Sequence, residues 1–325
     1  MAANVGAPTT AKSLAREKVK GLWIAIPTPF TADAGHVDED ALTAAVEHYV
    51  DVLRVDGIFC GGVMGEFWAL SLEERLRVHE LVARQAAGRV PVMAHVGHHV
   101  FSEMLALCQH AIAHGIDFGI AMNPYYPPAP PAESVRAWYE ALAGASSLPM
   151  FLFNTTYAGY TLSPELIAEL AELDNVCGVK NPQPPEHLLR VQALAGDRIV
   201  VTDASERHWL ELHTEHGFQA LMSTPALALI QRPDDLPILE YTRLADSGAL
   251  AEARELSDRL GPARDAFDRW MREPWLERRV IPIAQLKAWL ALVGLPQGPV
   301  RPPLVPLRRD EEVALRRDLE AAGLL

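Results

Sequence analysis

The stretch PMFLFNTTYAGYTLSPELIAELAELDNVCGVKNP, residues 149–182, contains a strand, a helix and a second strand in that order. Its two ends, 149–154 and 176–181, are short apolar runs bounded by Gly, Pro, Asn or Asp, as buried strands are. Between them, SPELIAELAEL repeats its apolar residues at helical spacing. A helix between two such strands is typical of a parallel sheet that helices cover on both faces.

The same alternation continues in both directions along the chain. Amphipathic helical patterns separate six further apolar runs, at 22–30, 57–65, 91–97, 118–124, 199–205 and 220–226. Eight strands that alternate with helices can close into a barrel, so the sequence predicts an α/β protein with a (β/α)8 TIM barrel over residues 21–230. Helical patterns alone follow, which predicts a C-terminal helical appendix, residues 231–325, packed on the barrel. Residues 1–20 are expected to be a loose N-terminal arm.

Composition narrows the classes of partner. The chain has 29 Lys and Arg against 42 Asp and Glu, a net charge of -13, which disfavours nucleic acid and anionic membranes. No apolar run approaches the length of a membrane span, and the N-terminus lacks the apolar core of a signal peptide. Cys60, Cys108 and Cys177 lie far apart in apolar contexts, as reduced thiols do. A cytoplasmic location is therefore expected.

Lys180 is one of only five lysines in the chain, and it lies at the end of the apolar run of the predicted strand 176–181. The chemistry of such barrels lies at the C-terminal ends of the strands. Burial there disfavours the ammonium form, so the free amine becomes a nucleophile that can form a Schiff base with a carbonyl. The alternative is a lysine with a buried stem whose head reaches solvent or pairs with Glu66 or Asp203.

Four segments resemble the dihydrodipicolinate synthase and N-acetylneuraminate lyase superfamily. They are GGVMGEFWALSLEERLRV (61–78), NPYYPP (123–128), FNTTYAGYTLSPELIAELAELDNVCGVKNP (153–182) and QGPVRPPLVPLRRDEEVALRRDLEAAGLL (297–325). The resemblance covers about residues 20–325. It implies a class I lyase, usually a homotetramer built as a dimer of dimers, in which a lysine condenses with the keto group of pyruvate or another 2-oxo acid. Lys180 matches that lysine.

The glycine-rich segment after the second strand is the expected carboxylate site. The resemblance assigns this role to Gly62, Val63, Met64 and Gly65, largely through backbone N–H groups. Glycines let a backbone approach an anion, and successive N–H groups form an anion-binding concavity, although a tight turn between strand and helix has the same pattern. Further substrate-binding candidates at strand ends are Thr28, Phe153, Asp203 and Ser223.

The chain departs from the family pattern at the residues that move protons. Most members carry hydroxyl residues where this chain has Val63 and Met64, and a tyrosine where it has Phe153. Without them the usual hydroxyl relay for making or breaking carbon–carbon bonds is absent. Tyr126 is the candidate surviving catalytic tyrosine, and in the family's tetramer its counterpart reaches across a dimer interface. Other candidate acids or bases are His95, His98 and Tyr157.

These observations predict a lyase that forms a Schiff base between Lys180 and a 2-oxo acid. The expected reaction is aldol cleavage or condensation, or dehydration of a 2-keto-3-deoxy acid, whereas strict dihydrodipicolinate synthase activity is disfavoured by Val63, Met64 and Phe153. The resemblance implies no cofactor, and the spacing of the histidines is not a common metal-ligand motif. The alternative function is a barrel that binds an oxo acid with little or no turnover.

Overall fold

The computed structural model describes residues 10–125 and 130–325. These residues form one sheet of eight parallel strands, in which each strand pairs with its neighbour in sequence and β1 pairs with β8. The strands are β1 (Gly21–Ala25), β2 (Gly57–Cys60), β3 (Val92–His95), β4 (Phe118–Met122), β5 (Met150–Phe153), β6 (Val176–Lys180), β7 (Val200–Thr202) and β8 (Ala220–Ser223). A bridge between Asp203 and Leu221 closes the ring, which confirms the (β/α)8 barrel with C-terminal helices.

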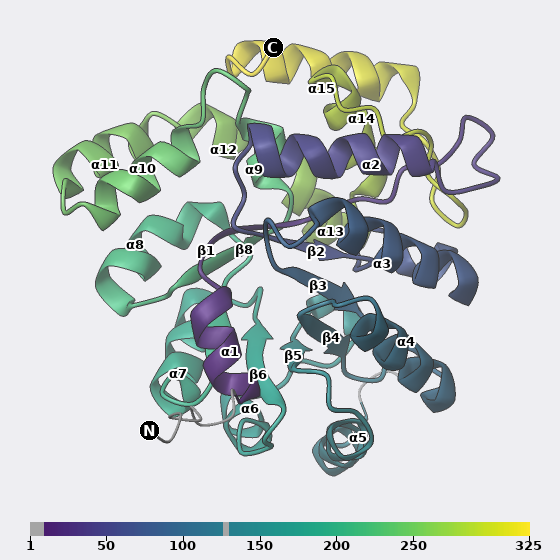
Figure 1. Ribbon diagram of the computed structural model, residues 1–325. Helices are drawn as coiled ribbons and strands as arrows, with labels where there is room; N and C mark the ends of the chain where they lie inside the picture. The colour runs from purple at the N-terminus through teal and green to yellow at the C-terminus, as the bar shows by residue number, and fades with distance from the viewer. Residues whose placement is uncertain (1–9, 126–129) are drawn as a thin grey trace, which may run out of the picture.

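Helices cover the outside of the sheet, as the alternating pattern predicts (Figure 1). Ser71 caps α3 and exchanges hydrogen bonds with Glu74, while Ser163 caps α6. The covering helices are α2 (Glu39–Glu47), α3 (Leu72–Ala86), α4 (Phe101–Ala113), α5 (Ala132–Ala145), α6 (Pro164–Leu170), α7 (Pro185–Ala195) and α8 (Glu206–His216). Short helical turns are η1 (His48–Val52), η2 (Phe67–Ala69) and η3 (Thr156–Ala158).

Aromatic rings fill the barrel interior, and two glycines make room for them. A Cβ atom at Gly57 would lie 2.2 Å from the Trp23 ring, and one at Gly178 would lie 2.1 Å from the Phe151 ring. The centroids of the Trp23 and Phe118 rings lie 6.5 Å apart. These rings occupy the interior of the barrel between the strands.

The expectation of a loose arm over residues 1–20 is wrong for residues 10–20, which the structure describes. Residues Ala11–Lys18 form helix α1, which contacts β6 and β7. Ala15 and Val19 are fully buried, and Lys12 Nζ donates a hydrogen bond to the carbonyl of Ala171 at 2.6 Å. Residues 10–20 contain few apolar residues, but Ala15 and Val19 among them are buried where α1 packs against β6 and β7. Residues 1–9 lie outside the described ranges.

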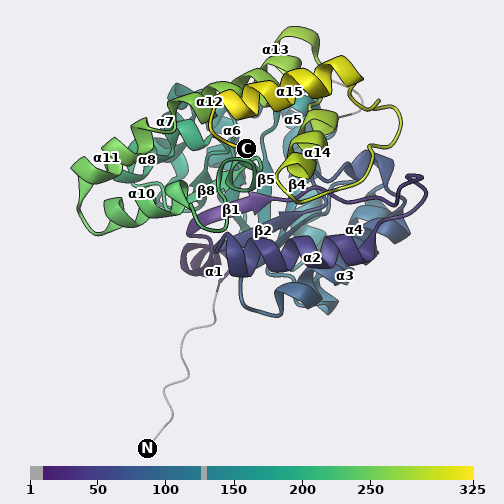
Figure 2. The same cartoon turned by 90° about the horizontal axis from the view of Figure 1, so that it is seen from above.

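The C-terminal region is helical, and it packs along one side of the barrel and across part of its mouth (Figure 2). Its elements are α9 (Ala226–Ile230), α10 (Pro237–Asp246), α11 (Leu250–Asp258), α12 (Gly261–Phe267), η4 (Asp268–Arg272), α13 (Glu273–Arg278), α14 (Ile283–Leu292) and α15 (Arg309–Ala321). Helix α14 contacts α9, η4 and α15. Within the described residues, no helix is both long enough and apolar enough to cross a bilayer.

Candidate active site

A cavity of about 510 Å³ lies at the C-terminal ends of the strands. Its inner part is lined by Phe59, Phe153, Lys180 and Asp203, which come from β2, β5, β6 and the end of β7. This is the end at which barrels of this class hold their active sites. The register of the sheet places Lys180 beside both Phe153 and Thr202, so Asp203 follows directly on the neighbouring strand.

Lys180 is buried against two aromatic rings. Its exposed fraction is 3%, and Nζ lies 5.0 Å from the centroid of the Phe59 ring and 5.4 Å from that of Phe153. Burial lowers the pKa of the Lys180 amine to about 7, although the negative charge of Asp203 opposes the shift. A large fraction of the side chain is therefore the free amine at neutral pH.

The structure does not support the alternative in which Lys180 is held in an ion pair. Both carboxylates suggested for that pair have other partners in the described part of the chain. Glu66 lies 2.7 Å from Lys287 Nζ, and Asp203 Oδ2 lies 3.1 Å from His208 Nδ1. The amine is left facing the cavity.

In the glycine-rich loop after β2, the backbone N–H groups of Val63 and Met64 are free to bind a ligand. Val63 and Met64 line the cavity, and no described residue accepts a hydrogen bond from the backbone N–H of either. The following N–H groups are used within the turn: Gly65 donates to the Gly62 carbonyl at 3.0 Å, and Glu66 donates to that of Val63 at 3.1 Å. A carboxylate bound here would meet unpaired backbone donors beside Lys180.

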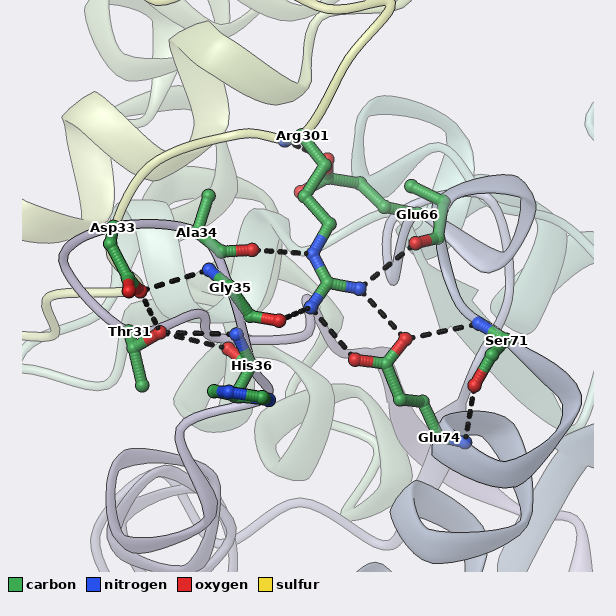
Figure 3. Close-up of polar contacts among 10 residues, drawn as sticks. Thr31, Asp33, Ala34, Gly35, His36, Glu66, Ser71, Glu74 and Arg301 are labelled. Atoms are coloured by element: carbon green, nitrogen blue, oxygen red, sulfur yellow. Dashed lines mark hydrogen bonds and ion pairs between the residues drawn. The ribbon is translucent and has the colours of Figure 1, made fainter.

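A buried ionic network holds this loop in place. Glu66 has the left-handed φ of 53°, is fully buried, and accepts a hydrogen bond from the backbone N–H of Arg301 at 3.0 Å in addition to its ion pair with Lys287. The Arg301 guanidinium donates to both oxygens of Glu74, at 2.7 and 2.8 Å (Figure 3). It also donates to the Ala69 carbonyl at 2.9 Å. Glu66 thus anchors the loop.

Two of the predicted substrate-binding residues support the site from outside the cavity lining. Thr28 is buried under the loop, where its Oγ1 lies 3.1 Å from the point that a Cβ at Gly65 would occupy. Ser223 Oγ donates to the Thr224 carbonyl at 2.9 Å and accepts from the N–H of Ala226 at 3.1 Å. Gly62 and Gly65 shape the turn, and they too are absent from the described lining.

The structure does not bring His95 or His98 to the Lys180 cavity. His95 is fully buried, with Nδ1 3.2 Å from Arg75 Nη2, and burial lowers the pKa of its imidazole well below the ordinary value. His98 Nε2 lies 3.0 Å from Glu103, and His98 lines a separate pocket of about 210 Å³ with Tyr125. The candidate tyrosine Tyr126 lies outside the described residues.

Tyr157 does line the cavity, on the short helix η3. Its ring packs edge-on against Trp275, with 4.4 Å between the centroids. Burial raises the pKa of the Tyr157 hydroxyl to about 12. At neutral pH this group is protonated, so it can donate a hydrogen bond but is a weak base.

The sequence analysis missed His208, which lies in the first turn of α8 and lines the cavity. Its Nδ1 lies 3.1 Å from Asp203 Oδ2. The signal that could have found it is the spacing, because a helix that begins three residues after a strand-end aspartate carries its third residue back toward that aspartate. The outer wall was also missed, because Phe267, Met271 and Trp275 come from the C-terminal helices.

A buried lysine with a lowered pKa, beside unpaired backbone N–H groups at the mouth of a (β/α)8 barrel, fits the class I aldolase-type lyases. The chain belongs to the dihydrodipicolinate synthetase family, whose model matches residues 18–322.

Relatives of known name and structure extend over nearly the whole chain. The 4-hydroxy-tetrahydrodipicolinate synthase of Methanopyrus kandleri is 31% identical over 312 residues, 95% of this chain and 98% of that protein. The crystal structure of dihydrodipicolinate synthase from Agrobacterium tumefaciens has 27% identity and a TM-score of 0.78, covering 94% of this chain and 99% of its own. A prophage protein of this family from E. coli K12, solved in complex with pyruvate, has 24% identity and a TM-score of 0.81 over 94% of this chain and 99% of its own, which shows the shared fold.

Proposed function

We propose that this protein forms a Schiff base between Lys180 and pyruvate or another 2-oxo acid, and that it then makes or breaks a bond beside the imine carbon. The observation that carries the proposal is the buried Lys180 amine, with a pKa of about 7, in a cavity that also offers the N–H groups of Val63 and Met64. The lysine attacks the keto carbon while the backbone donors hold the adjacent carboxylate.

The proposed reaction is aldol cleavage or condensation, or dehydration of a 2-keto-3-deoxy acid. Curated relatives are named 4-hydroxy-tetrahydrodipicolinate synthases. Strict activity of that kind is disfavoured here, because the inner cavity presents Phe153, Val63 and Met64 where a relay needs hydroxyl groups. Phe153 packs edge-on against Phe59 with 5.8 Å between centroids, so the region around the amine is apolar.

Borohydride reduction in the presence of pyruvate tests the proposal. Reduction of the imine adds the pyruvate carbons to one lysine irreversibly, and peptide mass analysis identifies which one. We expect the adduct on Lys180 and none on Lys20, an exposed lysine that serves as an internal control. If neither pyruvate nor a panel of 2-oxo acids gives an adduct on Lys180, the mechanism is wrong.

A barrel that binds an oxo acid with little or no turnover is the second candidate, and Phe153 is the residue that favours it. Such a protein would still trap pyruvate on Lys180. It would neither release an aldehyde from an aldol substrate nor dehydrate a sugar acid. Assay of turnover on a panel of both substrate types therefore separates the two functions.

We expect the outer wall of the cavity to contact the aldehyde or distal half of the substrate and not the pyruvate half. Trp275 contributes a large apolar surface far along the chain from Lys180. We expect Trp275→Ala to raise KM for the aldehyde or distal half by roughly tenfold or more while leaving KM for pyruvate within about twofold. Trp270→Phe is the matched control, because Trp270 donates to Asp318 at 3.1 Å and does not line the described cavity. An equal rise in both KM values in Trp275→Ala would contradict this assignment.

The remaining expectations on assembly and location stay predictions. A homotetramer is proposed from the family, although one similar solved structure, 25% identical with a TM-score of 0.79 over 98% of this chain and 99% of its own, is described as a monomeric dihydrodipicolinate synthase variant. Light scattering after size-exclusion chromatography tests the tetramer. A cytoplasmic location is likewise proposed.

A further inference from the structure

We propose that His208, oriented by Asp203, is the acid/base catalyst that acts on the imine formed at Lys180. The inference rests on the proposed function, because it requires a 2-oxo acid bound to the lysine. It assigns the proton transfers that Phe153 cannot perform to a strand-end aspartate and a histidine in the first turn of α8.

The contact between Asp203 and His208 determines which nitrogen is free. A carboxylate can only accept a hydrogen bond, so at 3.1 Å from Asp203 Oδ2 the Nδ1 atom carries the proton. In the neutral ring Nε2 is then the acceptor, and among the described residues it has no hydrogen-bond partner. Asp203 is 2% exposed and its backbone closes the barrel, so the aspartate is a rigid support. The contact thus fixes the orientation of the ring and leaves Nε2 free.

The position of this pair relative to Lys180 is suitable. His208, Asp203 and Lys180 all line the same cavity. Thr202 is the register partner of Lys180, so Asp203, the next residue, lies beside the lysine, where its charge raises the pKa of the amine. The His208 side chain remains 27% exposed, so the ring is accessible to a ligand.

The other groups that line the cavity are poorer candidates. Tyr157 has a pKa near 12 and is a weak base at neutral pH. The hydroxyl groups of Thr155, Thr156 and Thr224 need a base of their own before they can take a proton. Within the described ranges, His208 is the only histidine of the cavity lining.

The proposed step conserves atoms and charge. After Lys180 has condensed with pyruvate and water has left, His208 Nε2 removes one proton from the methyl carbon. The C–H electron pair becomes the new carbon–carbon double bond, and the electrons of the iminium double bond return to the nitrogen, which gives the enamine. The imidazolium is stabilised by the Asp203 carboxylate. In the condensation direction it returns the proton to the aldehyde oxygen as the carbon–carbon bond forms.

Exchange of the pyruvate methyl protons tests this step without knowledge of the second substrate. In D₂O, proton NMR follows the loss of the methyl signal, and borohydride trapping follows imine formation on Lys180 in the same protein. We expect His208→Asn to slow exchange by about 100-fold or more and to leave the yield of the Lys180 adduct unchanged. His213→Asn is the matched control, because His213 lies on the same helix and its Nε2 pairs with Asp246 at 2.7 Å, outside the described cavity lining.

The outcomes separate the two proposals. Exchange at the wild-type rate in His208→Asn, with Lys180 still trapped, would overturn the role of His208 and leave the Schiff-base function intact. Loss of both exchange and trapping in His208→Asn and in His208→Gln would also overturn it, since His208 would then serve the structure of the site. Absence of trapping in the wild-type protein would refute the proposed function itself.

Discussion

Replacing Lys180 with methionine is expected to abolish imine formation and, at pH 6, to raise the free energy of unfolding by about 4 to 5 kcal/mol. The pKa of this amine is about 7 in the folded protein and 10.5 ordinarily. Between pH 7 and pH 10.5 the unfolded chain binds a proton at Lys180 that the folded chain does not bind. The free energy of unfolding therefore increases as pH rises through this range. Below pH 7 burial of Lys180 therefore lowers the free energy of unfolding by its full amount, and replacement by the apolar methionine removes this destabilisation.

Denaturant titration at two pH values checks the sign of this effect. The gain from Lys180→Met should be about 2 to 3 kcal/mol smaller at pH 9 than at pH 6, because fewer unfolded chains gain a proton relative to the native state. Lys20→Met, at an exposed site, should show little change at either pH. A gain that is equal at both pH values would mean that burial does not depress the pKa of Lys180.

The second large effect is expected at Lys287, which lies far from Lys180 in sequence. Lys287→Met removes the cation that lies 2.7 Å from the fully buried Glu66. Loss of one partner from a buried pair leaves an uncompensated charge and typically costs about 3–5 kcal/mol. We expect a loss of stability of that size, measured by denaturant titration, and weaker trapping of pyruvate, because Glu66 anchors the loop that carries Val63 and Met64.

A double variant identifies the cause. Lys287→Met combined with Glu66→Gln removes both charges, so it should recover part of the stability lost in the single variant. Lys18→Met, which breaks the surface pair with Asp117, should cost at most about 1 kcal/mol. If the double variant is no more stable than Lys287→Met alone, the charge of Glu66 is not the source of the loss.

The barrel could be predicted from sequence because its determinants are local. Each strand is a short apolar run, each helix has a repeating face, and caps such as Ser71 are marked by residue type. The exception is α1: a local capping box of Thr10 and Ser13 marks its start, but its docking depends on Ala15 and Val19 packing against the barrel. Lys180 could be singled out for the same local reason, since it lies at a strand end, whereas the expected role of the loop at Val63 came from the family resemblance.

The rest of the site depends on contacts between distant segments. His208 acquires a role only through its contact with Asp203, and Trp275 reaches the cavity from the C-terminal helices. His95 and His98 were predicted from position after a strand, but the side chain of His95 packs into the protein beside Arg75. Local pattern does not say which way a side chain turns.

The anchor at Glu66 also has a consequence for biosynthesis. Arg301 contacts Glu66 across 235 residues of chain, so a segment close to the C-terminus helps to hold the loop that would bind the carboxylate. During synthesis the N-terminal part of the barrel leaves the ribosome first. Its glycine-rich loop can contact Lys287 and Arg301 only after those residues have been synthesised. Nascent chains that stop short of residue 301 would contain Lys180 without the contacts that Arg301 makes with Glu66 and Glu74.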